Sequence, residues 1–196
     1  HHLTTRRQRQ MCIRDRGFSQ PRMVIKTYVP DDNFEAYLET HDASGNVVSV
    51  GDANSMGDGI ANNDYVTTAN ISGVTNLDIQ SKNITDLTGI EDFNALTKLY
   101  CYNNQLTILD VSNNTALTGL YCQETQLTSL DVSNNTALTE LYCRQNQLTS
   151  LDVSQNTALT QLACPDNQLT SLDVSQNSVL NTLYCNYNQL ISLDVR

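Results

Sequence analysis

The feature that most constrains the fold is a repeat of 21 residues that runs from Leu96 to Arg196. Four copies are complete and a fifth breaks off; they begin at Leu96, Leu117, Leu138, Leu159 and Leu180. A period of about 20 to 29 residues with Leu and Asn at fixed offsets is typical of coils stacked on one another. Because one coil cannot bury its own Leu side chains, about three or more must stack for stability.

Each copy contains one short pattern twice. Its first half fits L-x-x-L-x-L-x-x-N-x-L with Cys in the third apolar position, and the second half restarts the pattern at Leu106. In the first copy the pattern residues are Leu96, Leu99, Cys101, Asn104 and Leu106, then Leu109, Val111, Asn114 and Leu117. The alternation in Leu99–Cys101 predicts a short strand, and that in Leu109–Val111 a second extended run across the coil.

Asn residues recur at both predicted corners of each coil. A corner leaves peptide groups pointing inward, and an Asn amide can both donate and accept hydrogen bonds there. The first column contains Asn104, Asn146, Asn167 and Asn188, and the second contains Asn114, Asn135, Asn156 and Asn177. Thr125 interrupts the first column, so we expect a local weakness at that corner.

These motifs resemble the leucine-rich-repeat family, in particular its nested 21-residue subtype in bacterial surface proteins, and more distantly the internalins. The resemblance covers about Thr27 to Arg196. It implies an α/β repeat fold that is mostly β, a right-handed leucine-rich-repeat solenoid with short parallel strands and an N-terminal cap helix. It also implies a curved surface used for binding, usually of protein, outside the cell; fold analogy identifies no ligand.

We expect three segments along the chain. Residues 1–26 form a non-native or disordered basic leader, residues 27–70 an N-terminal cap, and residues 71–196 the solenoid, truncated at its C-terminal end. The leader holds seven of the eleven Lys and Arg and shows no apolar periodicity. A basic arm that binds nucleic acid, or a localisation signal, is the alternative, whereas the apolar segment of a secretory signal is missing.

Within the cap, a helix is predicted at about residues 32–40. Asp32 followed by Glu35 fits a capping box, and an apolar helix face contains Phe34, Tyr37 and Leu38. This face would cover the end of the solenoid core, which a terminal repeat otherwise leaves open to water.

A Gly-, Asp- and Asn-rich loop follows the predicted helix, within residues 41–70. Its segment Asp52–Asp58 has a faint likeness to a calcium loop, but Met56 stands where an oxygen ligand is needed. We therefore interpret the segment as a solvated, turn-rich loop.

Residues 71–95 form a divergent first coil. Leu77–Ile79 is its predicted strand, and apolar residues then recur every three positions at Ile84, Leu87, Ile90, Phe93 and Leu96. That spacing predicts a 3₁₀-like convex side. No closing element follows the last strand pattern, and an uncapped edge invites association, so we expect the natural protein to continue past Arg196.

Charge excludes several classes of partner. Residues 27–196 contain four basic and 20 acidic residues, a balance of −16. A surface this acidic disfavours nucleic acid and anionic membranes, and no apolar run approaches the roughly 18 residues of a membrane span. We therefore expect neither nucleic-acid binding nor membrane insertion.

Five of the six Cys occupy one repeat position, namely Cys101, Cys122, Cys143, Cys164 and Cys185. This is not the C-x-x-C spacing of metal sites. We interpret the five as an inward column of small core side chains. Disulfides between neighbours and a metal or redox role are the alternatives, and parallel side-chain directions suit a disulfide badly.

The candidate ligand-binding residues lie at the predicted strands and the corners that follow them. Tyr100, Tyr121, Tyr142 and Tyr184 form one row, interrupted by Ala163; nearby candidates are Tyr102, Glu124, Arg144, Asp166 and Tyr187. In the family this strand faces the concave surface. Rigid aromatic side chains offer contact area at little entropic cost. The alternative is that the Tyr side chains only stabilise neighbouring strands, and the two interpretations are compatible.

A second row lies in the other half of each copy, at Asp110, Asp131, Asp152, Asp173 and Asp194, and we assign Asp78 to it in the first coil. Carboxylates repeated in every coil repel one another. Hydrogen bonds from the flanking Ser residues or backbone, raised pKa values, or weakly bound cations could offset the repulsion.

No catalytic, cofactor or resident metal site is predicted. The repeating polar residues recur in register, whereas catalysis needs one asymmetric cluster, and the repeats contain no His. The sequence favours a non-catalytic recognition module that binds a protein on its concave, Tyr-bearing face, at the cell surface or outside the cell. A glycan-binding surface module and a structural spacer of a longer bacterial adhesin are the alternatives.

Overall fold

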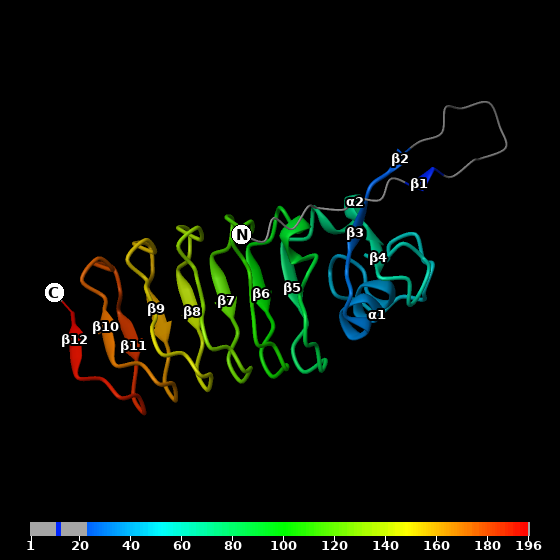
Figure 1. The fold of residues 1–196 in the computed structure, drawn as a ribbon. Coiled ribbons are helices and arrows are strands. Elements are labelled where there is room, and N and C mark those ends of the chain that lie inside the picture. The colour runs from blue at the N-terminus through cyan, green and yellow to red at the C-terminus, as the bar shows by residue number, and fades with distance from the viewer. Residues whose placement is uncertain (1–10, 13–22, 196) are drawn as a thin grey trace, which may run out of the picture.

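The computed structural model describes residues 11–12 and 23–195. Among these residues strands outnumber helices, and two short α-helices lie in the N-terminal part (Figure 1). The elements before the repeats are β1 (Met11–Cys12), β2 (Met23–Val24), β3 (Lys26–Tyr28), α1 (Asp32–Thr40), β4 (Tyr65–Thr67), α2 (Thr68–Ile71), β5 (Asn76–Asp78) and the 3₁₀ helix η1 (Ile90–Asp92). Those of the repeats are β6 (Lys98–Tyr100), β7 (Gly119–Tyr121), β8 (Glu140–Tyr142), β9 (Gln161–Ala163), β10 (Ser171–Asp173), β11 (Thr182–Tyr184) and β12 (Ser192–Asp194).

One parallel sheet runs along the stacked coils and confirms the predicted solenoid. Its six strands follow the order β11-β9-β8-β7-β6-β5 (Figure 1). Equivalent residues pair in register, so that Leu99 lies opposite Leu120 and Tyr100 opposite Tyr121. In each strand from β6 to β9 the middle Leu is fully buried, because alternation turns it inward while its neighbours face outward.

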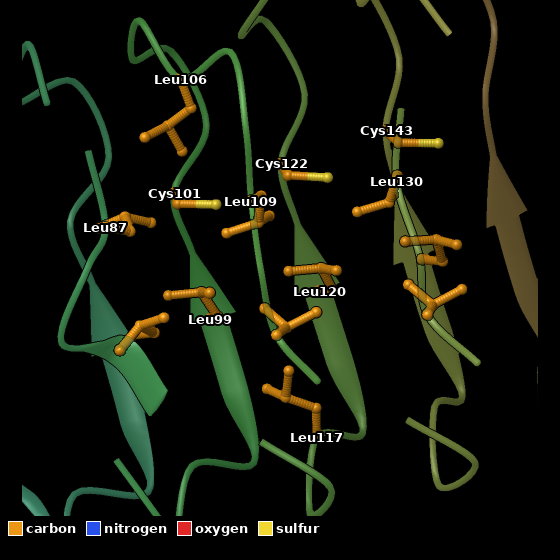
Figure 2. Packing of buried hydrophobic residues seen from close by; sticks show 14 of the residues in the cluster. Leu87, Leu99, Cys101, Leu106, Leu109, Leu117, Leu120, Cys122, Leu130 and Cys143 are labelled. Carbon is orange, nitrogen blue, oxygen red and sulfur yellow. The ribbon is translucent and has the colours of Figure 1, made fainter. Parts of the chain in front are cut away.

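The Cys side chains form the expected inward column. Cys101, Cys122, Cys143 and Cys164 are free and fully buried, and Cys185 in the last coil is half-buried. Figure 2 shows three of their sulfur atoms pointing the same way from successive coils. Burial raises the pKa of the Cys101 and Cys164 thiols to about 12. The column is therefore a set of protonated core side chains.

The Asn columns satisfy the corners as predicted. Asn104 shows the pattern of the first: its Nδ2 donates to the carbonyl oxygens of Ile79 and Cys101, each at 2.9 Å, and its Oδ1 accepts from the N–H of Lys82 and Ile84. In the second column each Nδ2 also donates to two carbonyls, as Asn135 does at 3.0 and 2.9 Å. There the four Oδ1 atoms have no hydrogen-bond partner among the described residues.

At the interrupted corner, the hydroxyl of Thr125 makes some of the hydrogen bonds that an Asn amide makes in the other coils. Thr125 Oγ1 lies within hydrogen-bonding distance of the Cys122 carbonyl at 3.0 Å and of Asn146 Oδ1 at 2.6 Å. One hydroxyl has a single proton to donate, whereas each Asn of the column donates to two carbonyls or more. The expected weakness at this corner remains a prediction.

The second half of each repeat is less regular than predicted. Only the last two coils form strands there, as β10 and β12 pair in parallel. The equivalent runs 109–111, 130–132 and 151–153 form no strand ladder. The predicted second extended run is therefore confirmed as a strand in the last two coils and stays a prediction in the others, and the backbone hydrogen-bonded ladder is continuous on the sheet side alone.

Helix α1 covers the first coil as predicted. Phe34 and Leu38 are fully buried, and the Phe34 ring stacks on Phe93 with centroids 6.2 Å apart. The predicted capping box is wrong, because the N-cap is Asp31, whose Oδ1 accepts from the N–H groups of Asn33 and Phe34. Glu35 instead accepts from the backbone of Asn63 and Asp64.

The cap extends slightly further than its predicted boundary. Strand β3 pairs antiparallel with β4, and Lys26 in β3 forms an ion pair with Asp58 at 2.6 Å. Residues 1–10 and 13–22 of the predicted leader lie outside the described residues, so the expectation of a disordered or non-native segment stays a prediction there.

The loop after α1 is turn-rich as expected, but part of it packs inward. Met56 is buried in the core, and Asp52 accepts hydrogen bonds from Asn54 within its own turn.

In the next coil the apolar residues spaced by three, from Ile84 to Leu96, are buried, and η1 confirms the predicted 3₁₀ geometry. Among the described residues, no helix has the length and apolar character needed to cross a membrane.

Candidate functional site

The candidate site is the outer side of the six-stranded sheet, called here the Tyr face because Tyr100, Tyr121, Tyr142 and Tyr184 project from it. In-register pairing places the first three side by side. The rings of Tyr100 and Tyr121 stack at 4.4 Å and 11°, and those of Tyr121 and Tyr142 at 5.2 Å and 18°. Three aromatic side chains are thereby held in one rigid array.

Hydrogen bonds from the ring hydroxyls fix this array. Tyr121 donates to the Glu140 carboxylate and Tyr142 donates to Gln161 Oε1, so each tyrosine reaches the first residue of the next strand. Gly119 leaves room for the Tyr121 ring, because a Cβ there would lie 3.0 Å from the ring carbon Cε2. Burial, followed by the hydrogen bond to Glu140, raises the pKa of the Tyr121 hydroxyl, which therefore stays protonated at neutral pH.

The other candidates form two rows beside the Tyr row. Tyr102 and Arg144 lie two residues after the row, and Glu124, Asp166 and Tyr187 lie three residues after it. Arg144 forms an ion pair with Glu124 across neighbouring coils. All nine predicted residues thus lie on or beside one face, with Tyr102 and Glu124 half-buried and Arg144, Asp166 and Tyr187 exposed.

The row that contains Glu124, Asp166 and Tyr187, three residues after the Tyr row, owes its position to the backbone conformation and not to its side chains. Asn103, Glu124, Gln145, Asp166 and Tyr187 all have a positive φ, between 52° and 55°. Non-Gly residues adopt this left-handed conformation infrequently, yet residues of five different types adopt it at this corner. The corner geometry imposed by stacking therefore positions Glu124, Asp166 and Tyr187.

The opposite side of the coils, called here the Asp face, carries Asp110, Asp131, Asp152, Asp173 and Asp194. The assignment of Asp78 to this row is wrong, because Asp78 pairs with Tyr100 in the six-stranded sheet. In the first four residues of the row, Asp Oδ1 accepts from the backbone N–H two residues later, at 2.8–3.0 Å. Hydrogen bonds from Ser133 and Ser154 lower the pKa values of Asp131 and Asp152. The alternative of raised pKa values is therefore wrong for these two carboxyls, and the hydrogen-bonded interpretation agrees with the geometry.

One carboxylate cluster that the sequence did not reveal lies in the cap. Oxygens of Asp32, Glu35 and Asp64 lie within 4.8 Å of one another, close enough to hold a cation. Glu35 is buried and already accepts hydrogen bonds from the backbone of Asn63 and Asp64. The position of the Glu35 carboxylate is explained by these hydrogen bonds, which fix the loop at residues 63–64.

Sequence reasoning missed the residues that orient the tyrosines. Gln161 and Gly119 were not singled out, although both occupy the first strand position, opposite Glu140 in the register. The signal was available in principle: this position lies 19 residues after the tyrosine of the preceding coil, and Tyr142 bonds to Gln161 across that separation. Side-chain length and direction, which the repeat pattern does not specify, decide whether the two meet.

Comparisons with known proteins show which proteins this chain resembles in sequence and in fold. A family model described as the LVIVD repeat matches residues 100–120, the length of one copy. Internalin J of Listeria monocytogenes is 47% identical over 52 residues, which cover 26% of this chain and 6% of that protein. The structure of a functional domain of internalin J, described as including a cysteine ladder, matches with 39% identity and a TM-score of 0.73, covering 87% of this chain and 35% of that one.

Two further solved structures share the architecture. An internalin of L. monocytogenes, InlF, is 26% identical with a TM-score of 0.59, covering 64% of this chain and 42% of that one. A leucine-rich-repeat protein of Leptospira interrogans is 24% identical with a TM-score of 0.58, covering 60% and 32%, and shows likeness of fold alone. The chain spans 35% of the internalin J structure that it matches.

Proposed function

Since the chain is an internalin-like leucine-rich-repeat protein, we propose that it is a non-catalytic recognition module that binds a protein partner through the Tyr face. The observation that carries the proposal is the stacked array of Tyr100, Tyr121 and Tyr142. Tyr is enriched at binding hot spots. Stacking and hydrogen bonding restrict these rings before any partner arrives, which reduces the entropy lost on association.

The charge distribution supports the same face. Among the described residues of the solenoid, the Tyr face and its flanking rows carry Lys98 and Arg144 together with Asp78, Glu124, Glu140 and Asp166. The Asp face repeats a carboxylate in each of the five 21-residue copies with no basic residue in the same row. Hot-spot regions of protein interfaces are depleted in Asp, Glu and Lys and enriched in Tyr and Arg, a description that fits the Tyr face better.

Curvature gives a further reason to favour this face. Backbone hydrogen bonds join each pair of neighbouring strands on the sheet side from β5 to β11. Such bonds hold strands about 4.8 Å apart, whereas the Asp face has a strand ladder only between β10 and β12 among the described residues. Coils tied together on one side bend toward it, and we infer that the Tyr face is concave.

The relatives motivate the location that we propose. A surface or secreted position would expose the Tyr face to partners outside the cell, as expected for an internalin-like protein. Glycan binding is the alternative on the same face, but the central tyrosine of the stack has each ring face covered by a neighbouring ring. Within the stack this arrangement leaves little ring surface for a sugar, which favours protein as the partner there.

The test begins with the purified chain as a probe of an extracellular-protein array and a glycan array. A partner found there is then measured against Tyr121→Ala/Tyr142→Ala and against the opposite-face control Asp131→Asn/Asp152→Asn. We expect the tyrosine variant to lose roughly tenfold or more in affinity and the control to bind as the parent does. Unchanged binding by a tyrosine variant whose melting is also unchanged would refute the proposal, and binding confined to glycans would support the alternative.

A further inference from the structure

One carboxylate beside the Tyr face has no side-chain partner among the described residues. Asp166 is exposed, and its side chain takes part in no ion pair or hydrogen bond there. The other acidic residues of the face and its flanking rows each have a partner, namely Arg144 for Glu124, Tyr121 for Glu140 and Gln80 for Asp78. The Asp166 carboxylate alone is left to contact solvent or a bound protein.

The repeat itself shows which residue would neutralise this carboxylate. Arg144 lies 20 residues after Glu124 and forms an ion pair with it across neighbouring coils. The residue 20 positions after Asp166 is Asn186, which is exposed and uncharged. The acid of this ion pair therefore recurs two copies later, but its base does not.

The backbone holds Asp166 in a fixed position. Its φ is 54°, and its N–H donates to the Asn186 carbonyl at 3.1 Å. Pro165 restricts the chain just before it, and the buried Asn167 just after it donates to the Cys143 carbonyl at 3.0 Å. Because the corner is already ordered, little backbone entropy is lost when a partner contacts this carboxylate.

We propose that Asp166 binds a basic side chain of the protein partner, which takes the place that Arg144 takes opposite Glu124. The inference rests on the proposed function, because it names a group that is recognised beside the Tyr row. A guanidinium forms charge-assisted hydrogen bonds with a carboxylate, and Arg is enriched at binding hot spots. The balance of −16 over residues 27–196 favours the approach of a basic partner.

Four variants separate this contact from the rest of the surface. Asp166→Asn removes the charge and should keep the fold, because Asn tolerates the left-handed conformation and Asn103 adopts it in the first copy. Asn186→Arg supplies the missing base within the chain. Asp173→Asn is the matched control, because it makes the same change in the same copy on the Asp face. Tyr121→Ala reports whether a ligand uses the Tyr face at all.

The probe is a displayed library of random linear peptides selected on the parent chain. Individual peptides are measured against each variant and are resynthesised with their Arg and Lys residues replaced by Gln. For peptides that Tyr121→Ala weakens, we expect Asp166→Asn and the Gln replacement each to reduce affinity about tenfold, as is usual for a hydrogen bond to a charged group. The two changes combined should cost little more than either alone, because they remove the same contact. Asn186→Arg should also weaken binding, and Asp173→Asn should leave it unchanged.

The outcomes that would overturn the inference differ in what they imply. Peptides that Tyr121→Ala weakens but that bind Asp166→Asn fully would sink the proposal for Asp166 while leaving the Tyr face as the binding surface. Equal losses with Asp166→Asn and Asp173→Asn would do the same, since they would show an effect of net charge alone. Peptides indifferent to Tyr121→Ala and Asp166→Asn alike would contradict both proposals.

Discussion

At the scale of single residues, position in the coil dominates over side-chain identity. Glu124, Gln145 and Tyr187 differ in charge and size, yet all adopt the same left-handed corner conformation. The buried Asn side chains are what bind one corner to the next, through hydrogen bonds to carbonyls of the preceding coil. Stability therefore depends on the columns, while the corner residues are free to vary for binding.

The interrupted Asn column makes this dependence measurable. Asn146, one coil later, donates to two carbonyls and accepts from a backbone N–H. Thr125 already bonds to the Cys122 carbonyl, so Thr125→Asn should add one donation and one acceptance. We predict a gain of about 1 kcal/mol in the free energy of unfolding, since that is typical of a net hydrogen bond. Chemical denaturation measures it.

The reverse change provides the control. Asn167→Thr removes donation to the Cys143 carbonyl and acceptance from Leu148, while a hydroxyl can keep the bond to Cys164 as Thr125 does to Cys122. It should lower stability by a similar amount or more because buried groups lose partners. Equal stability of Thr125→Asn and the parent would show that the hydroxyl already serves this corner fully.

At the scale of elements, one carboxylate joins the cap to the solenoid. Asp31 caps α1 with Oδ1, while its Oδ2 accepts from the backbone N–H and the hydroxyl of Thr85, each at 2.8 Å, and from the N–H of Asp86. Desolvation opposes its ionisation, but the hydrogen bonds from Thr85, Phe34 and Asp86 outweigh it and lower the pKa of Asp31. The helix and the first coil thus share one anionic acceptor.

The hydrogen bonds of Asp31 to the helix and to the first coil predict that the cap is sensitive to acid. Because the pKa of Asp31 is lower in the folded than in the unfolded state, its contribution is present above the unfolded value of about 4 and is lost as the pH falls through the folded value. We expect Asp31→Asn to cost about 1–2 kcal/mol at neutral pH. The difference in stability between Asp31→Asn and the parent should narrow below about pH 4. Melting temperatures measured across pH follow this difference.

Asp32→Asn is the companion measurement for this prediction, because Asp32 is exposed in the first turn of the same helix. Its effect should be small at all pH values. A gap between Asp31→Asn and the parent that does not change with pH would show that the charge of Asp31 is not what joins the cap to the coil.

The elements also show how far the sequence alone could predict the structure. The strict period of Leu, Cys and Asn specifies which residues point inward, so the sheet, its register and the Cys column were predictable. The contact between Asp31 and Thr85 and the burial of Met56 were not, because the partners lie far along the chain and outside the repeat. For the site, the row of candidate tyrosines was predictable, but the stacking and the role of Gln161 depend on side-chain direction.

At the scale of the whole molecule, stability should be shared between neighbouring coils. Leu141 and Leu183 occupy the same repeat position, but Leu141 lies in an interior coil and is fully buried, while Leu183 lies in the last coil and is partly buried. We predict that Leu141→Ala costs about 2–5 kcal/mol, the usual range for a buried Leu. Leu183→Ala should cost on the order of 1 kcal/mol.

Chemical denaturation of the two variants decides between a stack and a single undivided core. Since the substitution is the same in both, any difference reports the position in the stack. Equal losses would contradict a stack whose end coil is weakly held.

Function at this scale depends on which side of the solenoid meets the partner, and side-chain oxidation footprinting tests that most directly. With a bound protein partner, we predict protection of Tyr184 and Tyr187, which are 57% and 78% exposed in the free chain. Ile108 and Ile191, 76% and 91% exposed on the other side of the coils, should remain as reactive as before. Protection of the two isoleucines with unchanged oxidation of the tyrosines would contradict the account.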